Sequence, residues 1–331
     1  MKLLVVILNY RVTDLTIDCL RSLEGRVDRV PGTRVAVVEN GTGGDAPERL
    51  RRAIDENGWA TWVDLTVVHP NRGFTGGNNL VIRPALASAD PPEYVLLLNA
   101  DTIVQDGALE ALVEVMDRHP RAGIAGSKLV WPEGGAQGTP FRFLGIATEI
   151  DNALRLGAVS RLVRPLSLSP KPTEACPVDW VAGASMILRR SMLEEVGLLD
   201  EGLYTYFDDV DLCLRARRVG WETWFVPESV VTHLEGRSTG IVAHVIKRRP
   251  DYWFQARRRF YLKNHGPLYA ALVDAAFILG FPIWRLRRRI QGRPDTDPPH
   301  LLRDFVRNSV FVAGFRVQEV ENPAMREPAV H

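Results

Sequence analysis

Polar side chains follow three apolar, strand-like segments of this 331-residue sequence. In an open parallel sheet, ligands bind outside the carboxyl ends of the strands, so such side chains are expected to share one crevice. A turn at the end of a strand would explain one such transition, but three together favour a shared site. The transitions run from Leu3–Leu8 into Asn9, from Val35–Val38 into Glu39, and from Tyr94–Leu98 into Asn99 and Asp101.

Other residues have types suited to metal binding and proton transfer. A carboxylate such as Asp101 is able to hold Mg²⁺ or Mn²⁺, which take further oxygens from water and substrate phosphates. Asp208 and Asp209 follow an aromatic run and open an expected helix, where the helix dipole favours acids. One exposed carboxylate there would serve as a general base for an attacking hydroxyl. His233, taken alone, fits either a structural role or a ligand role.

A glycine-rich stretch from Asn71 to Asn79 follows the third expected strand. Glycines let a backbone approach a ligand closely, and the start of a following helix attracts anions, so this stretch is a candidate wall of a nucleotide pocket. Two common nucleotide motifs are absent: no G-x-G-x-x-G follows the first strand, and no G-x-x-x-x-G-K-[ST] occurs in the chain. Dehydrogenase and P-loop NTPase functions are therefore excluded.

The elements that must position these residues alternate along the first 130 residues. Continuous Val, Leu and Ile runs, separated by helical patterns, predict a parallel sheet covered by helices on both faces. We expect strands at Leu3–Leu8, Val35–Val38, Leu65–Val68, Tyr94–Leu98 and Gly123–Leu129, and helices at Asp14–Leu23, Pro47–Asn57, Asn79–Ser88 and Gly107–His119.

Residues 131–240 are expected to complete the same domain. Loops or a short insertion are expected over Gly134–Pro177, which is rich in Gly, Pro and Arg. The further elements are an ordered run at Val178–Leu188, helices at Ser191–Val196 and Asp208–Val219, and short strands at Trp224–Val226 and Val230–Thr232.

Composition and cysteine content are those of a globular protein from a reducing compartment. Hydrophobic residues make up 46% of the chain and charged residues 24%, and the formal net charge of +1 creates no chain-wide attraction for nucleic acid. Cys19, Cys176 and Cys213 have no CxxC spacing, which excludes a disulfide framework and a zinc knuckle. The apolar N-terminal run ends at Asn9 without a small-residue cleavage site. We expect a cytoplasmic protein.

Residues 241–331 are predicted to form a basic helical extension. Twelve Lys and Arg but only two acids lie between positions 245 and 293. The apolar run Pro267–Trp284 contains Asp274 and is short for a membrane span, which needs about 20 residues. These features favour a surface-lying amphipathic helix pair attracted to anionic lipid, with a solvated appendage and a spanning helix as alternatives. The segment is also rich in aromatic residues: Tyr252, Trp253, Phe254, Phe260 and Tyr261.

Seven short motifs, taken in order, resemble the inverting family 2 glycosyltransferases, especially the bacterial rhamnosyltransferase-like branch. The likeness covers residues 1–240, and it implies that residues 1–130 form the nucleotide-binding half of one domain and residues 131–240 its acceptor and catalytic half. Each motif is loose by itself, and their order makes the signal specific. The motifs are Leu8–Tyr10, Val37–Thr42, Asn71–Asn79, Leu97–Thr102, Val178–Ala184, Tyr206–Arg215, and His233 with Gly236 and Ser238.

The resemblance implies a GT-A fold, with a mostly parallel central sheet flanked by helices. It also implies transfer of a sugar from a nucleotide-diphosphate donor, with inversion at the anomeric carbon. The residues that match the family's functional positions are Asp209 and Asp208 for catalysis, Asp101 and His233 for Mg²⁺ or Mn²⁺, Trp180 and Gly183 beside the donor sugar and acceptor, and Asn9, Glu39, Asn71, Gly73, Asn79 and Asn99 for the nucleotide and donor.

Three positions depart from the family pattern. Asn99-Ala100-Asp101 stands in place of a DxD motif, Glu39 in place of the usual Asp, and Asp208-Asp209 in place of Glu-Asp. The first change removes one carboxylate from the expected metal site, and the second places a longer side chain near the expected nucleoside pocket.

The expected partners are a nucleotide-diphosphate sugar and a glycan or lipid-linked acceptor in cell-surface polysaccharide synthesis. Branch likeness favours dTDP-rhamnose, with UDP and GDP sugars open. The basic, aromatic C-terminal segment is expected to place the enzyme against a lipid-linked acceptor. Peripheral contact with the inner face of the cell membrane is expected, and nucleic acid is not. The alternatives are a non-catalytic nucleotide-sugar-binding partner protein and a sugar-nucleotide nucleotidyltransferase. The latter would need a basic, Gly-rich loop after the first strand, where the sequence reads Asn9-Tyr10-Arg11-Val12.

Overall fold

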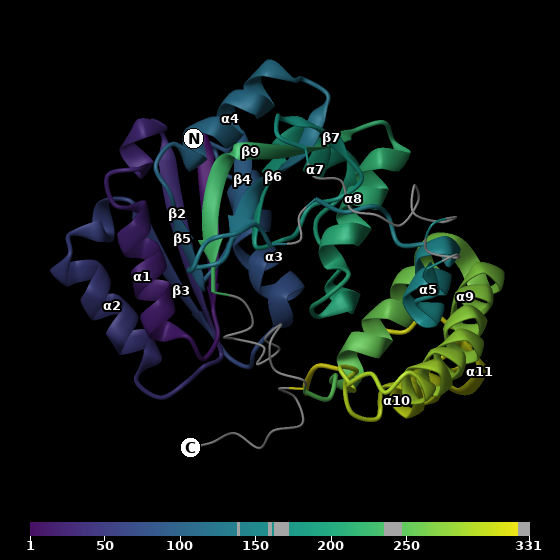
Figure 1. Cartoon of the computed structure of the whole chain (residues 1–331). Coiled ribbons are helices and arrows are strands. Elements are labelled where there is room, and N and C mark those ends of the chain that lie inside the picture. Colours follow the sequence, from purple (N-terminus) through teal and green to yellow (C-terminus); the bar gives the residue numbers. More distant parts are fainter. Residues whose placement is uncertain (138–139, 158–160, 162–171, 235–246, 324–331) are drawn as a thin grey trace.

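A computed structural model describes the chain except residues 138–139, 158–160, 162–171, 235–246 and 324–331. Its centre is a nine-stranded sheet with helices on both faces (Figure 1). The strand order is β3-β2-β1-β4-β8-β6-β9-β5, and β7 pairs with β9. The strands are β1 Leu3–Asn9, β2 Thr33–Asn40, β3 Val63–Val68, β4 Tyr94–Asn99, β5 Thr102–Val104, β6 Ala122–Val130, β7 Cys176–Val178, β8 Ser185–Arg189 and β9 Glu222–His233.

Two sets of helices cover the two faces of the sheet. One set consists of α1, α2 and α4, and the other of α3, α7 and α8. Their bounds are α1 Thr13–Leu23, α2 Ala46–Glu56, α3 Gly73–Leu86, α4 Ala108–Arg118, α7 Arg190–Val196 and α8 Asp208–Arg218, with 3-10 turns η1 Val27–Arg29, η2 Trp59–Thr61 and η3 Glu201–Leu203.

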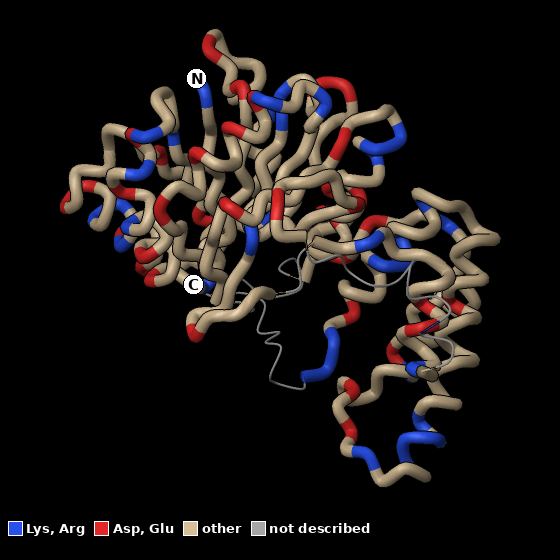
Figure 2. Tube along the Cα trace, turned by 45° about the horizontal axis from the view of Figure 1, so that its top comes forward, with Lys and Arg blue, Asp and Glu red and all other residues tan. Residues whose placement is uncertain are grey.

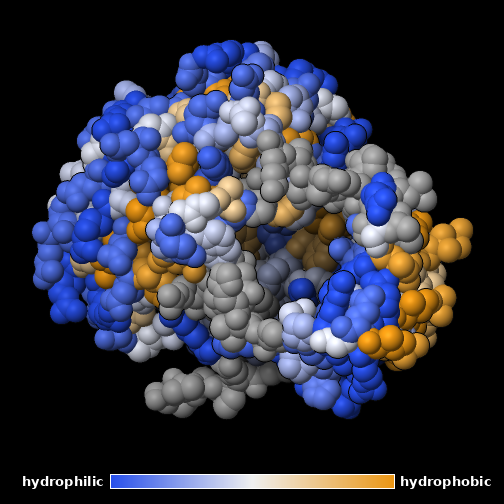
Figure 3. Space-filling model, viewed as in Figure 1, coloured by the Kyte–Doolittle hydropathy of each residue, from blue (hydrophilic) through white to orange (hydrophobic). Residues whose placement is uncertain are grey.

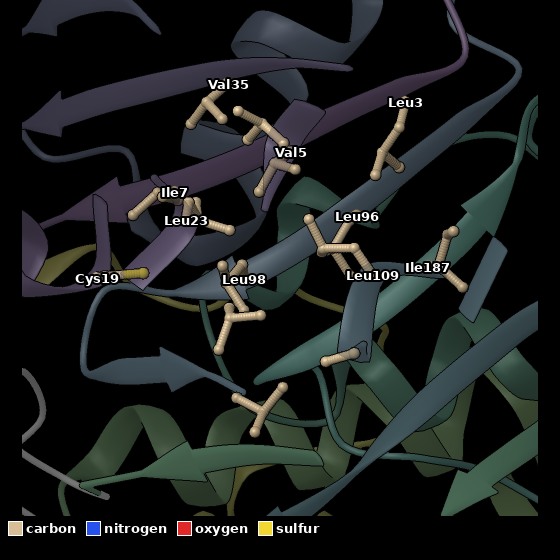
Figure 4. Packing of buried hydrophobic residues seen from close by; sticks show 14 of the residues in the cluster. Leu3, Val5, Ile7, Cys19, Leu23, Val35, Leu96, Leu98, Leu109 and Ile187 are labelled. Atoms are coloured by element: carbon tan, nitrogen blue, oxygen red, sulfur yellow. The ribbon is translucent and has the colours of Figure 1, made fainter. Parts of the chain in front are cut away.

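Strands β3, β2, β1 and β4 form the parallel part of the sheet that the sequence predicts. Side chains alternate between the two faces of a strand. On β1, Leu3, Val5 and Ile7 therefore pack on the side of α1, α2 and α4 (Figure 4), whereas Leu4 and Val6 pack on the side of α3, α7 and α8. Burial on both faces explains why the run is continuously apolar.

The second half of the sheet is mixed. Strand β8 is antiparallel to both β4 and β6, and β6 is parallel to β9. The two short strands predicted at Trp224–Val226 and Val230–Thr232 are one strand, β9, with a register shift opposite Ser127 and Lys128. The short strand β5 was not predicted, because its three residues are too few to show a period. It pairs with the end of β9.

Part of the segment predicted as loops is helical. Helix α5 spans Ile146–Leu154 and packs closely on α9, where a Cβ on Gly280 would lie 2.9 Å from the Cβ of Ala153. The rest of the predicted loop region lies partly outside the described residues.

Three helices follow the sheet domain: α9 Asp251–Ile290, α10 Leu301–Asn308 and α11 Val310–Ala313. Gly266, with a φ of +82°, interrupts α9, so that it consists of two helical segments. Phe254, Phe260 and Tyr261 are buried in the packing of these helices. The expectation that these three aromatic side chains face a lipid-linked acceptor is therefore wrong.

Basic and acidic residues both occur along these helices (Figure 2), and several of the basic ones pair with acids inside the protein. The buried Arg257 lies 2.6 Å from a carboxylate oxygen of Asp274, and Lys263 lies 2.9 Å from Asp211 and 2.8 Å from Asp200. Part of the positive charge noted in the sequence therefore joins the helices to one another and to the sheet domain.

Candidate active site

A cavity of about 660 Å³ lies at the carboxyl ends of β1 and β4, bounded on its other side by α9. It corresponds to the hollow near the centre of Figure 3. Nine of the twelve site residues predicted from the sequence line it: Asn71, Gly73, Asn99, Asp101, Trp180, Gly183, Asp208, Asp209 and His233.

Asn99, Asp101 and His233 converge on one wall of this cavity. The pairing of β5 with β9 places Thr102 opposite His233, and the amide of Leu234 donates to the carbonyl of Asp101 at 2.9 Å. As a result, Nε2 of His233 lies 3.4 Å from Oδ1 of Asp101 and 3.3 Å from Nδ2 of Asn99. Residues 132 positions apart are thus brought together by strand pairing.

Gln137 determines which nitrogen of His233 carries the proton. Its Nε2 donates to the carbonyl of His233 at 2.6 Å, so its Oε1 must face Nδ1 of the same residue, 3.0 Å away. An amide oxygen only accepts, so Nδ1 is protonated in the neutral ring. The lone pair of Nε2 therefore points toward Asp101. Sequence analysis missed Gln137, because nothing in its local pattern marks it.

This arrangement fits a divalent cation. An imidazole lone pair and a carboxylate face one another, and the ring is oriented by a neighbouring amide, as is common for metal-binding histidines. Within the described residues, no group of three His, Cys, Asp or Glu side chains could hold a metal by itself. Mg²⁺ and Mn²⁺ would accordingly need oxygens from water and from a bound phosphate, which is how these ions commonly bind.

The two acids predicted for catalysis begin α8 after a strained turn. Tyr204, Tyr206 and Phe207 all have positive φ, between 52° and 67°, a conformation that costs about 1–3 kcal/mol for each such residue. Asp208 is buried, whereas Asp209 is partly exposed and lines the cavity. Strained backbone that aims a carboxylate into a cavity is a recurrent feature of functional sites.

Burial raises the pKa of both acids. For Asp208, burial and then repulsion from Asp209 hold the pKa well above the ordinary value. For Asp209, burial raises the pKa, and hydrogen bonds from the amides of Val210 and Gly183 oppose that rise. A carboxylate with a raised pKa is a stronger base once ionised.

Trp180 and Gly183 lie beside Asp209. The Trp180 ring stacks on Phe141 with centroids 4.2 Å apart, and its Nε1 donates to the carbonyl of Arg142 at 2.8 Å. The amide of Gly183 donates to Oδ2 of Asp209 at 3.3 Å. An apolar wall of the cavity therefore lies next to the Asp209 carboxylate. The side chains of Leu144, Phe207, Tyr252 and Trp253 also belong to this wall.

The glycine-rich stretch forms the start of a helix rather than a loop, because α3 begins at Gly73, six residues before the predicted start. Asn40 links this segment to β2: its Nδ2 donates to Oδ1 of Asn71 and to the carbonyl of Gly73, both at 3.0 Å. A Cβ on Gly77 would lie 2.5 Å from Leu8, so that glycine serves the packing of α3 on β1.

Asn9, Glu39 and Asn79 do not line the cavity. The side-chain oxygen of Asn9 accepts a hydrogen bond from the hydroxyl of Thr16. The Glu39 carboxylate accepts hydrogen bonds from the amides of Gly41 and Thr42. These bonds stabilise the ends of β1 and β2. The Asn79 amide donates to the carbonyl of Leu199 at 2.8 Å. All three are buried behind the cavity wall, and their contact with a nucleotide stays a prediction.

The described end of the chain returns to the same cavity. Asn322 donates from Nδ2 to the carbonyl of Asn71 at 2.7 Å, and Pro323 lines the cavity. Sequence analysis missed this contact, because it joins positions 251 residues apart.

Replacing Gly73 by alanine is expected to disturb the cavity wall. Gly73 has a φ of +72°, and a Cβ there would meet the ring and the carbonyl of Tyr204 at 2.4–2.5 Å. Gly43 is a matched control, because its φ is +73° but nothing lies within 4 Å of its Cβ position. We expect Gly43→Ala to cost about 1 kcal/mol of unfolding free energy from backbone strain, and Gly73→Ala about 1–3 kcal/mol more from overpacking. Urea unfolding of both variants measures the difference, and equal losses would contradict the close approach.

Comparison with known proteins supports the family resemblance. The family model described as "Glycosyltransferase like family 2" matches residues 2–251. An N-acetylglucosaminyl-diphospho-decaprenol L-rhamnosyltransferase of Mycobacterium tuberculosis is 28% identical over 203 residues, which cover 55% of this chain and 64% of that protein. The low-salt glycan biosynthesis hexosyltransferase Agl10 of Haloferax volcanii is 25% identical over 226 residues, which cover 65% of this chain and 61% of that protein. The chain thus spans less than two thirds of the length of these relatives.

Solved structures share the fold at low sequence identity. GalNAc-T7 with UDP, GalNAc and Mn²⁺ superposes with a TM-score of 0.60 at 16% identity, covering 93% of this chain and 54% of that one. The mannosyltransferase PcManGT from Pyrobaculum calidifontis, with GDP-Man and Mn²⁺, superposes with a TM-score of 0.51 at 14% identity, covering 95% of this chain and 84% of that one. These likenesses confirm the GT-A fold, and the family model, which matches most of the chain, shows that this protein belongs to glycosyltransferase family 2.

Proposed function

We propose that this enzyme transfers a sugar, with inversion, from a nucleotide-diphosphate donor to a hydroxyl of a glycan or lipid-linked acceptor. The observation that carries the proposal is that the Asp209 carboxylate and the Asp101–His233 pair open into the same cavity. The Asp209 carboxylate is suited to take a proton, and the Asp101–His233 pair is suited to hold a cation beside a diphosphate. A non-catalytic nucleotide-sugar-binding protein would have no need of the strained turn that presents Asp209.

In this mechanism each residue has a distinct task. Asp209 accepts the proton of the acceptor hydroxyl while the oxygen attacks the anomeric carbon of the donor. The bond from that carbon to the nucleoside diphosphate breaks on the opposite face, so the configuration inverts. Asp101 and His233 would hold Mg²⁺ or Mn²⁺, which neutralises the charge of a departing diphosphate. Gln137 keeps the His233 lone pair directed at Asp101.

The names of the relatives support a rhamnosyl donor, such as dTDP-rhamnose, and an acceptor carried on a lipid diphosphate. The aromatic wall formed by Trp180, Phe207, Tyr252 and Trp253 supports a sugar acceptor, because sugars stack their apolar faces on aromatic rings. A role in cell-surface polysaccharide synthesis agrees with the O-antigen biosynthesis protein RfbC of Myxococcus xanthus, which is 31% identical over 219 residues. The three cysteines, all free, support a cytoplasmic location.

Replacing the proposed base should abolish transfer without loss of donor binding. Asp209→Asn keeps the shape of the side chain but cannot accept the proton, so we expect a fall in turnover of about 10²–10⁴-fold. Asp64→Asn, on an exposed strand position, is the control and should retain full turnover. Turnover is measured by release of nucleoside diphosphate, and donor binding by calorimetry. Normal turnover in Asp209→Asn would remove this residue from the role of base.

The raised pKa of the acid pair predicts the acid side of the pH–rate profile. Asp209 must be ionised to act, so turnover should fall as the pH drops through its raised pKa, above the range of an exposed aspartate. Asp208 has the higher pKa of the two, partly because of the charge on Asp209, so it is still protonated when Asp209 ionises. Asp208→Asn keeps that neighbour neutral, and the acid limb of this variant should therefore stay in place. An acid limb that moves to lower pH would show that Asp208 is already ionised when Asp209 titrates.

A screen of nucleoside diphosphates tests both the donor and the metal. We expect one of UDP, GDP, dTDP or ADP to raise the melting temperature in the presence of Mn²⁺, because a ligand that binds the folded state stabilises it. Asp101→Ala should lose the Mn²⁺-dependent part of that increase, whereas Asp106→Ala, an exposed aspartate outside the cavity, should keep it. An equal Mn²⁺-dependent shift in the Asp101→Ala variant would exclude Asp101 from the metal site.

A further inference from the structure

Large apolar side chains are exposed along one face of the second half of α9. Six of them recur at helical spacing, and each is 49–77% exposed. We name this set the apolar stripe: Leu268, Leu272, Leu279, Ile283, Leu286 and Ile290. Helix α11 and the residues after it add the exposed Phe311, Val312 and Phe315. Figure 3 shows this apolar surface at the right-hand edge, over the C-terminal helices. Exposed apolar faces of this size mark interaction sites.

We propose that the apolar stripe docks the enzyme onto the surface of an anionic lipid bilayer. This proposal states that the proposed transferase acts at a membrane surface, and it does not depend on the identity of the donor. The sequence led us to expect a helix pair around Pro267–Trp284 that lies on anionic lipid, and the proposal now specifies which side chains of that segment meet the lipid. Phe254, Phe260 and Tyr261 are not among them, because they are buried.

The charge around the stripe favours an anionic partner. From Leu268 to Trp284, the only charged residue is Asp274, which is buried and paired with Arg257. Exposed arginines follow at the C-terminal end, where Arg285 pairs with Asp295. In the part of the chain that the structure describes, Arg289 and Arg293 make no ion pair and are exposed. Cations beside an apolar helix face bind lipid headgroups while the apolar side chains enter the acyl boundary.

The packing of α9 favours a helix that lies in the interface over one that crosses the bilayer. By length and composition α9 could span a membrane, since an 18-residue window has a mean hydropathy of 1.6. One face of this segment is however covered by protein: Phe277 and Phe281 pack with Ala153 and Phe305. Asp274 also accepts the amide of Val310 at 2.8 Å on that side. A spanning helix would have to give up these contacts and expose a carboxylate to lipid.

The same helix connects the stripe to the cavity. The first segment of α9 supplies Tyr252 and Trp253 to the cavity wall, and the second carries the stripe. Docking of the stripe would hold this wall next to the headgroup layer, where the hydroxyls of a lipid-linked acceptor lie. A second copy of this chain is a less suitable occupant, because it carries the same unpaired cations and would not neutralise them.

Vesicle flotation tests the proposal on the full chain. We expect the protein to float with phosphatidylcholine vesicles that contain phosphatidylglycerol, and to bind less to phosphatidylcholine alone. The double variant Leu279→Glu/Ile283→Glu should lower the partition coefficient about tenfold or more, because both side chains would leave the lipid. Arg289→Gln/Arg293→Gln should lower binding to the anionic vesicles about fivefold for each arginine and weaken its dependence on salt.

Val67→Glu is the matched control, since Val67 is 41% exposed on β3, away from the C-terminal helices. It should bind vesicles as the unchanged protein does. All variants change exposed side chains, and an unchanged melting temperature, with the same nucleotide-induced shift, verifies that the cavity is intact. This shift also separates a failure of docking from a failure of the proposed enzyme function.

Three results would overturn the proposal. The first is that the unchanged protein fails to float with anionic vesicles. The second is that Leu279→Glu/Ile283→Glu binds them as the unchanged protein does. The third is that the unchanged protein is a dimer by light scattering and this variant a monomer, with neither of them bound to vesicles. That outcome would assign the stripe to contact between copies of the chain.

Discussion

The buried carboxylate of Asp211 holds together the parts of the chain that form the cavity. Its side chain is fully buried and lies 2.8 Å from Arg215, 2.9 Å from Lys263 and 2.7 Å from Nδ2 of Asn264. Arg215 in turn donates to the carbonyls of Val196 and Leu198. One carboxylate thus joins α8, which carries the proposed catalytic acids, to α9, which forms the opposite wall. Removing one member of so buried a group leaves a charge unpaired, which costs about 3–5 kcal/mol in comparable proteins.

The strained turn before α8 depends on contacts with α3 and α9. Its positive φ angles are maintained by contacts on both sides: the carbonyl of Tyr204 accepts from the amide of Phe74 at 2.7 Å, and the rings of Tyr206 and Tyr252 stack with centroids 6.0 Å apart. The start of α3 therefore meets the turn from one side and α9 from the other. Strain of this kind persists only where neighbouring elements impose it. The C-terminal helices are consequently part of the cavity's construction.

The proposed metal side of the cavity is also built from segments that lie far apart in the sequence. Its two proposed ligands lie next to strands that meet because β5 pairs with β9, and the third residue, Gln137, reaches in from the segment after β6. The missing first carboxylate of the family's DxD motif is replaced by Asn99, whose amide lies against His233. Compared with a carboxylate, the Asn99 amide lowers the negative charge of the site, and it still provides a hydrogen-bond partner for the His233 imidazole.

The sequence by itself predicted the parallel strands β1 to β4, most of the flanking helices, the GT-A fold and the family. These follow from short-range properties: burial on both faces makes a strand continuously apolar, and motif order along the chain does not depend on packing. It also identified nine residues that line the cavity, because strand ends in such a sheet share one edge.

Only the tertiary structure decided the rest. Gln137, Asn40 and Asn322 act through partners 31 to 251 residues away, and no local pattern encodes such distances. Asn9, Glu39 and Asn79 lie behind the cavity wall rather than on it. The sequence predicts that the apolar run Pro267–Trp284 lies on lipid, but only the structure shows which of its side chains are exposed: Leu279 and Ile283 are, whereas Phe277 and Phe281 are buried. Composition gives the amount of charge and apolar area in a helix, but which face meets the protein is determined by the buried ion pairs and the packing that orient it.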